Sequence, residues 1–233
     1  MNNQQSTQGI ILARTDYGEA DRILTLLTPG YGKLRLIAKG VRRVKSKLAG
    51  GIELFSVSDL MFIKGRGEIG TLVSARLDRH FRHIVKDLDR TMLGYELIRL
   101  LNKNTEDETE GEYFELLETG FESLDDVHIP RDIIEFWFYA QLLRLGGQAP
   151  NLHTDASGAK LQAGQAYSFD VQEMTFAVAP EGRGRFTADD IKFLRLAFAG
   201  SKPKLLNHVE GAPQLAAKLA PLVTTMLQNN MVF

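Results

Sequence analysis

The stretch Arg22-Ile-Leu-Thr-Leu-Leu-Thr-Pro-Gly-Tyr-Gly-Lys-Leu-Arg-Leu-Ile-Ala38 is typical of two short strands joined by a tight turn. Its two ends are rich in branched apolar side chains, and the Pro-Gly-Tyr-Gly sequence between them is a strong turn signal. Further strands are predicted over residues 9–15, 52–64 and 69–77. Five short strands in about 70 residues have the size of an OB-fold, a small barrel whose exposed face and loops commonly bind oligonucleotides. We therefore predict an OB-fold domain over residues 1–80.

After residue 80 the apolar residues recur at helical spacing. Helices are predicted over residues 84–101, 113–124, 130–145, 191–199 and 213–227. Pro221 is expected to kink or divide the last of them. Glycines and two short apolar runs interrupt the helical pattern at about residues 148–182, which predicts a small β-rich insertion. The predicted fold class is α+β: a five-stranded barrel followed by a mainly helical domain, residues 81–233, that carries this insertion.

Positive charge is concentrated in residues 22–52, which contain eight Lys or Arg and no Asp or Glu. Alternation along the third strand places Lys33 and Arg35 on one face. Glycines at 40, 50 and 51 flank a loop with five more cations. With no acid nearby in the sequence, these cations predict binding to phosphates. The alternative is a solvated loop that only aids solubility. The candidate contacts are Arg22, Lys33, Arg35, Lys39, Arg42, Arg43, Lys45, Lys47 and, in the turn before the fifth strand, Arg66.

The two signs of charge are separated along the chain, although the formal net charge is only −1. Residues 1–86 carry 15 Lys and Arg against 7 Asp and Glu, whereas residues 87–130 carry 3 against 13. One part of the molecule can then bind a polyanion while another repels it or meets a basic partner. The alternative for the acidic part is a purely solubilising role.

Several classes of site have no support in the sequence. The chain has no cysteine, which excludes disulfides, thiolate catalysis and cysteine-ligated metal sites. Of its five histidines only His80 and His83 are close in sequence, and their basic surroundings suit phosphate contact better than zinc. No nucleophile with a base, carboxylate pair or phosphate loop is recognisable. We predict that the protein is not an enzyme, uses no metal or cofactor, does not contact membranes and is cytoplasmic.

The order of several short motifs resembles the RecO family of bacterial DNA repair and recombination mediators. These motifs are Tyr17-x-Glu19-x-Asp21-Arg22-Ile23, Gly32-Lys33, Ala38-Lys39-Gly40-Val41-Arg42-Arg43, Lys45-Ser46-Lys47 and Leu54-Phe55. Weaker similarity continues at residues 95–97, 145–150 and 167–170. The resemblance implies an OB-fold, a helical domain and, in some relatives, a zinc-ribbon-like insertion.

The resemblance also implies a function. Such proteins bind single- and double-stranded DNA, anneal complementary strands, and work with RecR and single-stranded DNA-binding protein to load RecA, in the bacterial cytoplasm at the nucleoid. The basic residues given above are then the expected DNA-binding residues. One departure is clear: Asp155-Ala-Ser-Gly158 stands where zinc-bearing relatives have a Cys-x-x-Cys pair. We therefore expect an insertion without zinc, held by packing.

A partner site is predicted on the helical domain. Single-stranded DNA-binding proteins end in an acidic, apolar tail, which would suit an apolar groove with a basic rim. The candidate residues are Lys192, Phe193, Arg195, Phe198 and Lys202. The alternative is a helix with ordinary surface lysines. For the whole protein, the alternatives are an RNA-binding or ribosome-associated OB-fold protein and a protein-binding scaffold.

Overall fold

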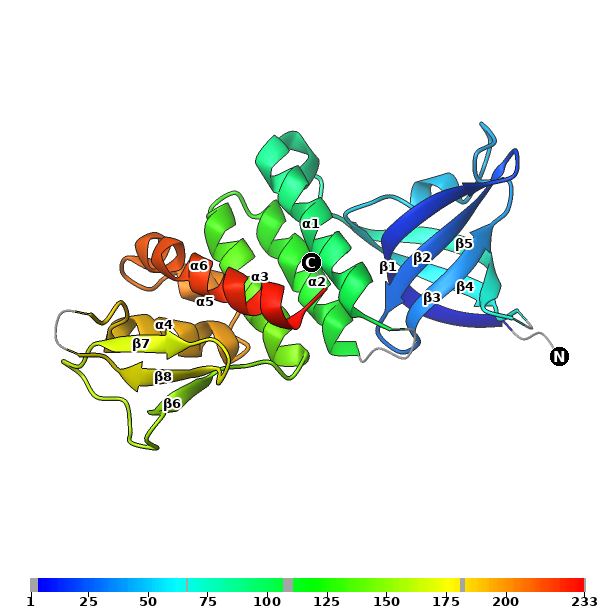
Figure 1. Ribbon diagram of the computed structural model, residues 1–233. Helices are drawn as coiled ribbons and strands as arrows, with labels where there is room; N and C mark the ends of the chain where they lie inside the picture. Colours follow the sequence, from blue (N-terminus) through cyan, green and yellow to red (C-terminus); the bar gives the residue numbers. More distant parts are fainter. Residues whose placement is uncertain (1–3, 66, 107–110, 181–182, 233) are drawn as a thin grey trace. The chain divides into compact units, whose positions relative to one another are not determined.

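The computed structural model describes residues 4–65, 67–106, 111–180 and 183–232 (Figure 1). The chain forms two compact units, residues 1–127 and residues 128–233. The first contains a five-stranded barrel and the second a three-stranded sheet, both accompanied by helices. The predicted α+β class, with an N-terminal barrel of OB-fold type, is confirmed.

Five strands close the barrel in the order β1-β2-β3-β5-β4. Their bounds are β1 Gln4–Tyr17, β2 Asp21–Thr28, β3 Gly32–Ala38, β4 Ser56–Ile63 and β5 Ile69–His80. β3 and β5 pair in parallel, and the other neighbours pair antiparallel. The turn between β2 and β3 is held by the Thr28 hydroxyl, which donates to the Gly32 carbonyl at 2.9 Å. The turn chemistry seen in the sequence thus sets the register of the central hairpin.

The fourth strand begins later than the predicted residue 52. Residues 49–51 form a 3₁₀ turn, and Phe55 has a left-handed backbone with φ 53°. Both Ile52 and Phe55 are 2% exposed. The segment leading to Ser56 therefore turns its apolar side chains into the core, where an extended strand would have turned alternate ones outward.

Gly51 allows this segment to pass directly over β5. A Cβ at Gly51 would lie 2.4 Å from the backbone carbon and oxygen of Ala75, which is shorter than any real contact. At Gly50 a Cβ would meet nothing within 4 Å. The close approach of this segment to β5 therefore requires a glycine at position 51 but not at position 50.

We expect Gly51→Ala to lower the free energy of unfolding by about 1–3 kcal/mol, because the added methyl group must push two backbone segments apart. Gly50→Ala is the matched control and should change stability by less than about 0.5 kcal/mol. Urea unfolding followed by far-UV circular dichroism measures both. Equal stability of the two variants would contradict the close approach at Ala75.

Two helices complete the first unit: α1, Leu88–Asn104, and α2, Gly111–Asp125. The helix predicted from residue 84 starts at Leu88, because residues 84–86 form a separate 3₁₀ turn and the Asp87 side chain caps α1 by accepting from the Arg90 amide. Phe55 packs edge to face on Tyr95 and Phe121, at 5.1 and 5.5 Å. These contacts place α1 and α2 in the same compact unit as the barrel. A separate domain boundary after residue 80 stays a prediction.

The second unit is built on α3, Arg131–Leu145, which packs against α4, Ala188–Phe198, and α6, Ala212–Asn230. A short helix, α5, spans Pro203–Asn207. The insertion forms a sheet of order β6-β8-β7, with bounds β6 Asn151–Asp155, β7 Tyr167–Asp170 and β8 Thr175–Val178. Tyr167 and Phe176 are almost fully buried, which agrees with an insertion held by packing.

The prediction that Pro221 divides the last helix is wrong, since α6 continues from Ala212 to Asn230. A proline removes the amide that would bond the carbonyl four residues earlier. Pro221 and Ala217 are both exposed, so water can satisfy that carbonyl. Among the described helices, none has the length and apolar character needed to cross a bilayer.

Candidate nucleic-acid interface

The basic loop, defined here as residues 39–48, is fastened to the tip of the β1–β2 hairpin. The Gly40 amide donates to the Asp21 carboxylate at 2.7 Å, and the Arg42 amide donates to the Ala20 carbonyl at 2.9 Å. The Arg42 guanidinium also donates to the Gly18 carbonyl at 3.4 Å. Val41 is 5% exposed and lies in the barrel core. The loop is therefore held at one end of the barrel, with its polar side chains outside.

Three of the predicted contacts form ion pairs within the protein. Asp16 lies 2.7 Å from Arg22 and 3.5 Å from Arg42, and these arginines hold the pKa of the Asp16 carboxyl below its usual value, with the hydrogen bond from Arg22 as the main cause. Arg35 lies 3.2 Å from Glu68. The expectation that no acid lies near the cations is therefore wrong, because β1 and the turn before β5 supply the carboxylates.

Lys33 has a structural contact. Its ammonium donates to the carbonyls of Asn102 and Thr105, at 2.8 and 2.7 Å, where α1 ends. Cations at this position satisfy the free carbonyls of a helix end and interact favourably with its dipole. Lys33 therefore stabilises the C-terminal end of α1.

Four cations of the basic loop are exposed and form no ion pair with any described residue: Lys39, Arg43, Lys45 and Lys47. Arg66 lies outside the described residues. The structure thus separates the described members of the predicted set into a group with partners within the protein, namely Arg22, Lys33, Arg35 and Arg42, and an unpaired group made of the four loop cations given above. Only the unpaired group keeps its full charge available to an external anion.

Two further exposed residues were not singled out in the sequence as candidate contacts. Tyr17, at the end of β1, is 54% exposed, and Val44 in the loop is 104% exposed. Tyr17 lies opposite Asp21 in the ladder between β1 and β2, and the Asp21 carboxylate accepts from the Gly40 amide of the basic loop. Surfaces that bind single strands commonly combine cations with exposed aromatic rings. The feature of the sequence that could have indicated Tyr17 is an aromatic residue at a strand end, directly before Gly18.

The predicted partner groove on α4 requires correction. Phe193 and Phe198 are 1% and 6% exposed, and Phe193 stacks on Phe136 at 5.4 Å. They belong to the core and cannot line an open groove. The Arg195 guanidinium donates to the Leu152 carbonyl at 2.6 Å, and Lys192 pairs with Asp189 at 2.8 Å. Lys202 is exposed at the start of α5.

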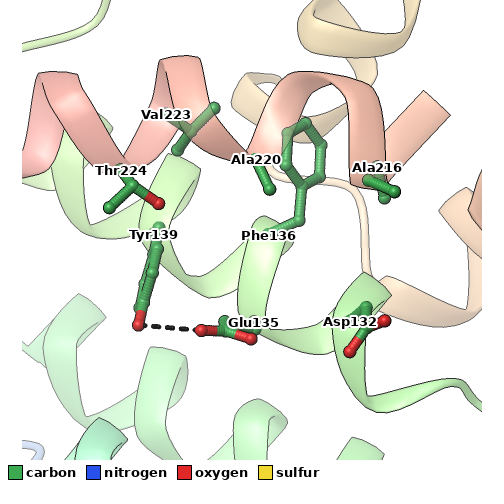
Figure 2. A pocket seen from close by; sticks show the side chains of 9 residues that line it. Asp132, Glu135, Phe136, Tyr139, Ala216, Ala220, Val223 and Thr224 are labelled. Carbon is green, nitrogen blue, oxygen red and sulfur yellow. Dashed lines mark hydrogen bonds between the residues drawn. The ribbon is translucent and has the colours of Figure 1, made fainter. Parts of the chain in front are cut away.

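A hollow of about 140 Å³ lies between α3 and α6 (Figure 2). Asp132 and Glu135 supply its charge, and the Tyr139 hydroxyl donates to Glu135 at 3.1 Å. The remaining lining is mostly apolar, with Phe136, Val223 and three alanines of α6. None of its described lining residues is cationic, so its chemistry is opposite to that required by an acidic tail.

A carboxylate organises the turn where zinc-bearing relatives would place their cysteines. Asp155 accepts from the amides of Ser157 and Ala159, at 2.9 and 3.0 Å, and from the Ser157 hydroxyl at 2.6 Å. These donors, led by the Ser157 hydroxyl, hold the pKa of Asp155 below its usual value. In the described ranges no three His, Asp or Glu side chains gather as a metal-binding group.

Two family models match this chain. "Recombination protein O N terminal" covers residues 1–81, and "Recombination protein O C terminal" covers residues 85–231. The junction between them follows the end of β5.

Curated relatives named "DNA repair protein RecO" agree with these matches. That of Rubrobacter xylanophilus is 34% identical over 236 residues, covering 90% of this chain and 94% of the relative. That of Halalkalibacterium halodurans is 35% identical over 146 residues, covering 62% of this chain and 57% of the relative. In several of these alignments, this chain spans only about three fifths of the length of the relative. With both models and one nearly full-length relative in agreement, the chain belongs to the recombination protein O (RecO) family.

Proposed function

We propose that this protein acts in DNA repair and recombination by binding DNA at the barrel and annealing complementary strands. The observation that carries the proposal is the fastened loop with four exposed cations that form no ion pair with a described residue; the exposed Tyr17 lies opposite Asp21, the residue that fastens this loop. The names of the curated relatives, which concern DNA repair, support the same assignment.

Annealing of this kind needs no reaction centre. Two complementary strands repel each other through their phosphates, and a surface that neutralises several phosphates lowers this barrier. Lys39, Arg43, Lys45 and Lys47 supply such a surface, while the bases stay free to pair. Arg22, Arg35 and Arg42 would have to exchange an internal carboxylate for a phosphate, so we assign them a smaller contribution.

Tyr17 gives the surface a preference for single strands. A phenol ring can stack on an unpaired base, and such stacking contributes about 1–3 kcal/mol per base. A duplex keeps its bases inside, so it can use only the cations. Single strands should therefore bind more tightly, and the product duplex should be released more easily.

The salt dependence of binding tests the number of contacts. If the four unpaired cations engage phosphates, the logarithm of the binding constant for single-stranded DNA should fall with the logarithm of salt concentration with a slope of about −2.8, from about 0.7 per contact. Fluorescence anisotropy of a labelled oligo(dT) strand between low and moderate salt measures it. A slope near zero would contradict the proposal, and tighter binding to folded RNA would favour an RNA-binding function.

We further propose interactions with RecR and with the tail of single-stranded DNA-binding protein, and an indirect role in loading RecA, at the bacterial nucleoid. For the tail, the exposed Lys192 and Lys202 remain the proposed basic contacts, supported only by their exposure and charge. Arg195 is engaged with Leu152, so its replacement would also disturb the insertion.

Lys192→Glu/Lys202→Glu should weaken binding of an acidic, apolar C-terminal peptide at least tenfold and leave oligo(dT) binding unchanged. Isothermal titration of the peptide, with anisotropy of the strand in parallel, measures both. Unchanged peptide affinity would contradict the assignment of Lys192 and Lys202 to the tail, and would leave the proposed DNA binding at the barrel intact.

A further inference from the structure

A larger hollow of about 550 Å³ lies in the second unit, on the side of the insertion sheet. We call it the aromatic hollow. β7, the segment 183–186 and α6 each contribute to it. Its described lining includes Phe169, Arg183, Arg185, Phe186 and Lys218.

Two aromatic rings of the hollow, Phe169 and Phe186, pack against a third ring, Phe176. Phe176, which is fully buried, contacts Phe169 at 4.8 Å and Phe186 at 5.7 Å, both edge to face. Phe169 and Phe186 themselves are only partly buried. The packing therefore orders both rings and leaves part of each accessible from the hollow.

The segment that carries the arginines is also fixed. The amides of Arg185 and Phe186 both donate to the Tyr167 carbonyl at 3.0 Å, and the Tyr167 amide donates to the Phe186 carbonyl at 2.8 Å. A Cβ at Gly184 would lie 2.4 Å from the Cβ of Ala166, so glycine permits this close approach to β7. Backbone positions are thus set before any ligand binds, which lowers the entropy lost on binding.

The charged side chains among the described lining residues of the hollow are all cations. Arg183 and Arg185 are exposed and form no ion pair with any described residue, and Lys218 pairs with the buried Asp190 at 2.5 Å. Among the described lining residues, no side chain is acidic. Flat rings with adjacent arginines suit a ligand that joins a planar apolar group to an anion, as a nucleotide does.

We propose that the aromatic hollow binds a short segment of single-stranded DNA, with phosphates on Arg183 and Arg185 and bases on Phe169 and Phe186. This rests on the proposed function and adds a second strand-binding site, in a different compact unit from the basic loop. An acidic peptide is also negatively charged and could likewise bind to these two arginines. A strand fits better because the lining includes two partly exposed aromatic rings on which bases can stack, and a guanidinium and a ring occupy adjacent positions at Arg185 and Phe186.

Photocrosslinking locates the strand directly. The full chain is irradiated with an oligonucleotide containing 5-iodouracil, and the crosslinked peptides are identified by mass spectrometry. We expect crosslinks at Phe169 or Phe186 in addition to the region of Tyr17. Crosslinks at Tyr17 alone would overturn the second site and leave the proposed function intact, whereas crosslinks in the hollow alone would overturn the barrel site. Loss of the hollow crosslinks to an equal nucleotide concentration of dTMP would identify a free-nucleotide site and overturn strand binding.

Charge reversal tests the same site without disturbing the rings. In protein that already carries Arg43→Glu/Lys45→Glu, we expect Arg183→Glu/Arg185→Glu to weaken oligo(dT) binding at least tenfold further. Lys160→Glu/Lys204→Glu, in exposed positions of the same unit outside the hollow, is the matched control and should change it less than threefold. Equal effects of both pairs would overturn the proposal, as would loss of acidic-peptide binding in Arg183→Glu/Arg185→Glu with unchanged strand affinity.

Discussion

Arg43→Glu/Lys45→Glu should weaken binding of single-stranded DNA at least 25-fold at about 0.1 M salt. Release of counterions makes each phosphate contact worth about a factor of 5 at that salt concentration. Two contacts are lost, and the two new carboxylates add repulsion. Both side chains are exposed and without ion pairs to described residues, so the change should leave the fold intact.

The matched control is Arg82→Glu/Lys86→Glu, which makes the same change of charge at two exposed positions in the same compact unit but outside the basic loop. It should weaken binding less than threefold. Anisotropy with labelled oligo(dT) measures both variants, and circular dichroism confirms their fold. A similar loss in both variants would mean that binding depends on the net charge of the unit and not on the loop.

Asp190→Ala should lower the free energy of unfolding of the second unit by about 2–3 kcal/mol. Asp190 is 1% exposed, and its carboxylate accepts from the amide and hydroxyl of Thr187, at 2.7 and 3.0 Å, and from Lys218 at 2.5 Å. Removing a carboxylate with charged partners leaves these donors unsatisfied at the start of α4. Fluorescence of Trp137, the single tryptophan, follows unfolding of this unit in urea.

Asp189→Ala is the control for this change, since Asp189 is exposed and its pair with Lys192 lies on the surface. Its effect should stay below about 0.5 kcal/mol. Equal destabilisation by the two variants would show that the buried capping box is not the source of the stability.

The pH dependence of Asp190 has a definite sign. Burial raises the pKa of its carboxyl, but Lys218 and Thr187 together hold it below the usual value. A lowered folded-state pKa contributes stability above the unfolded pKa of about 3.9, and this stability is lost as the pH falls through the folded pKa. The stability difference between the native protein and Asp190→Asn should therefore be full at neutral pH and shrink below about pH 4.

Local patterns in the sequence were sufficient to predict the barrel. Alternating apolar residues and the Pro29-Gly30-Tyr31-Gly32 turn specify β2, β3 and their register without reference to distant residues. The start of β4 was missed because Phe55 takes a left-handed backbone to pack on Tyr95 and Phe121, residues that are remote in the sequence.

The surroundings of the predicted contact residues could be predicted less well, for a related reason. The cations of residues 22–52 have no acidic neighbours in the sequence, but pairing of strands brings Asp16 beside Arg22 and Arg42. Lys33 contacts carbonyls about 70 residues away, at the end of α1. Composition identified a cation-rich segment, and only the tertiary contacts divide it into cations that are engaged within the protein and cations that are available.

The rate at which two complementary labelled oligonucleotides anneal, with native protein and with Arg43→Glu/Lys45→Glu, tests the central claim most directly. We predict acceleration by the native protein that weakens as salt is raised, and little acceleration by the variant at any salt concentration. Equal acceleration by both proteins, or none by well-folded native protein, would contradict the assignment of annealing to the basic loop.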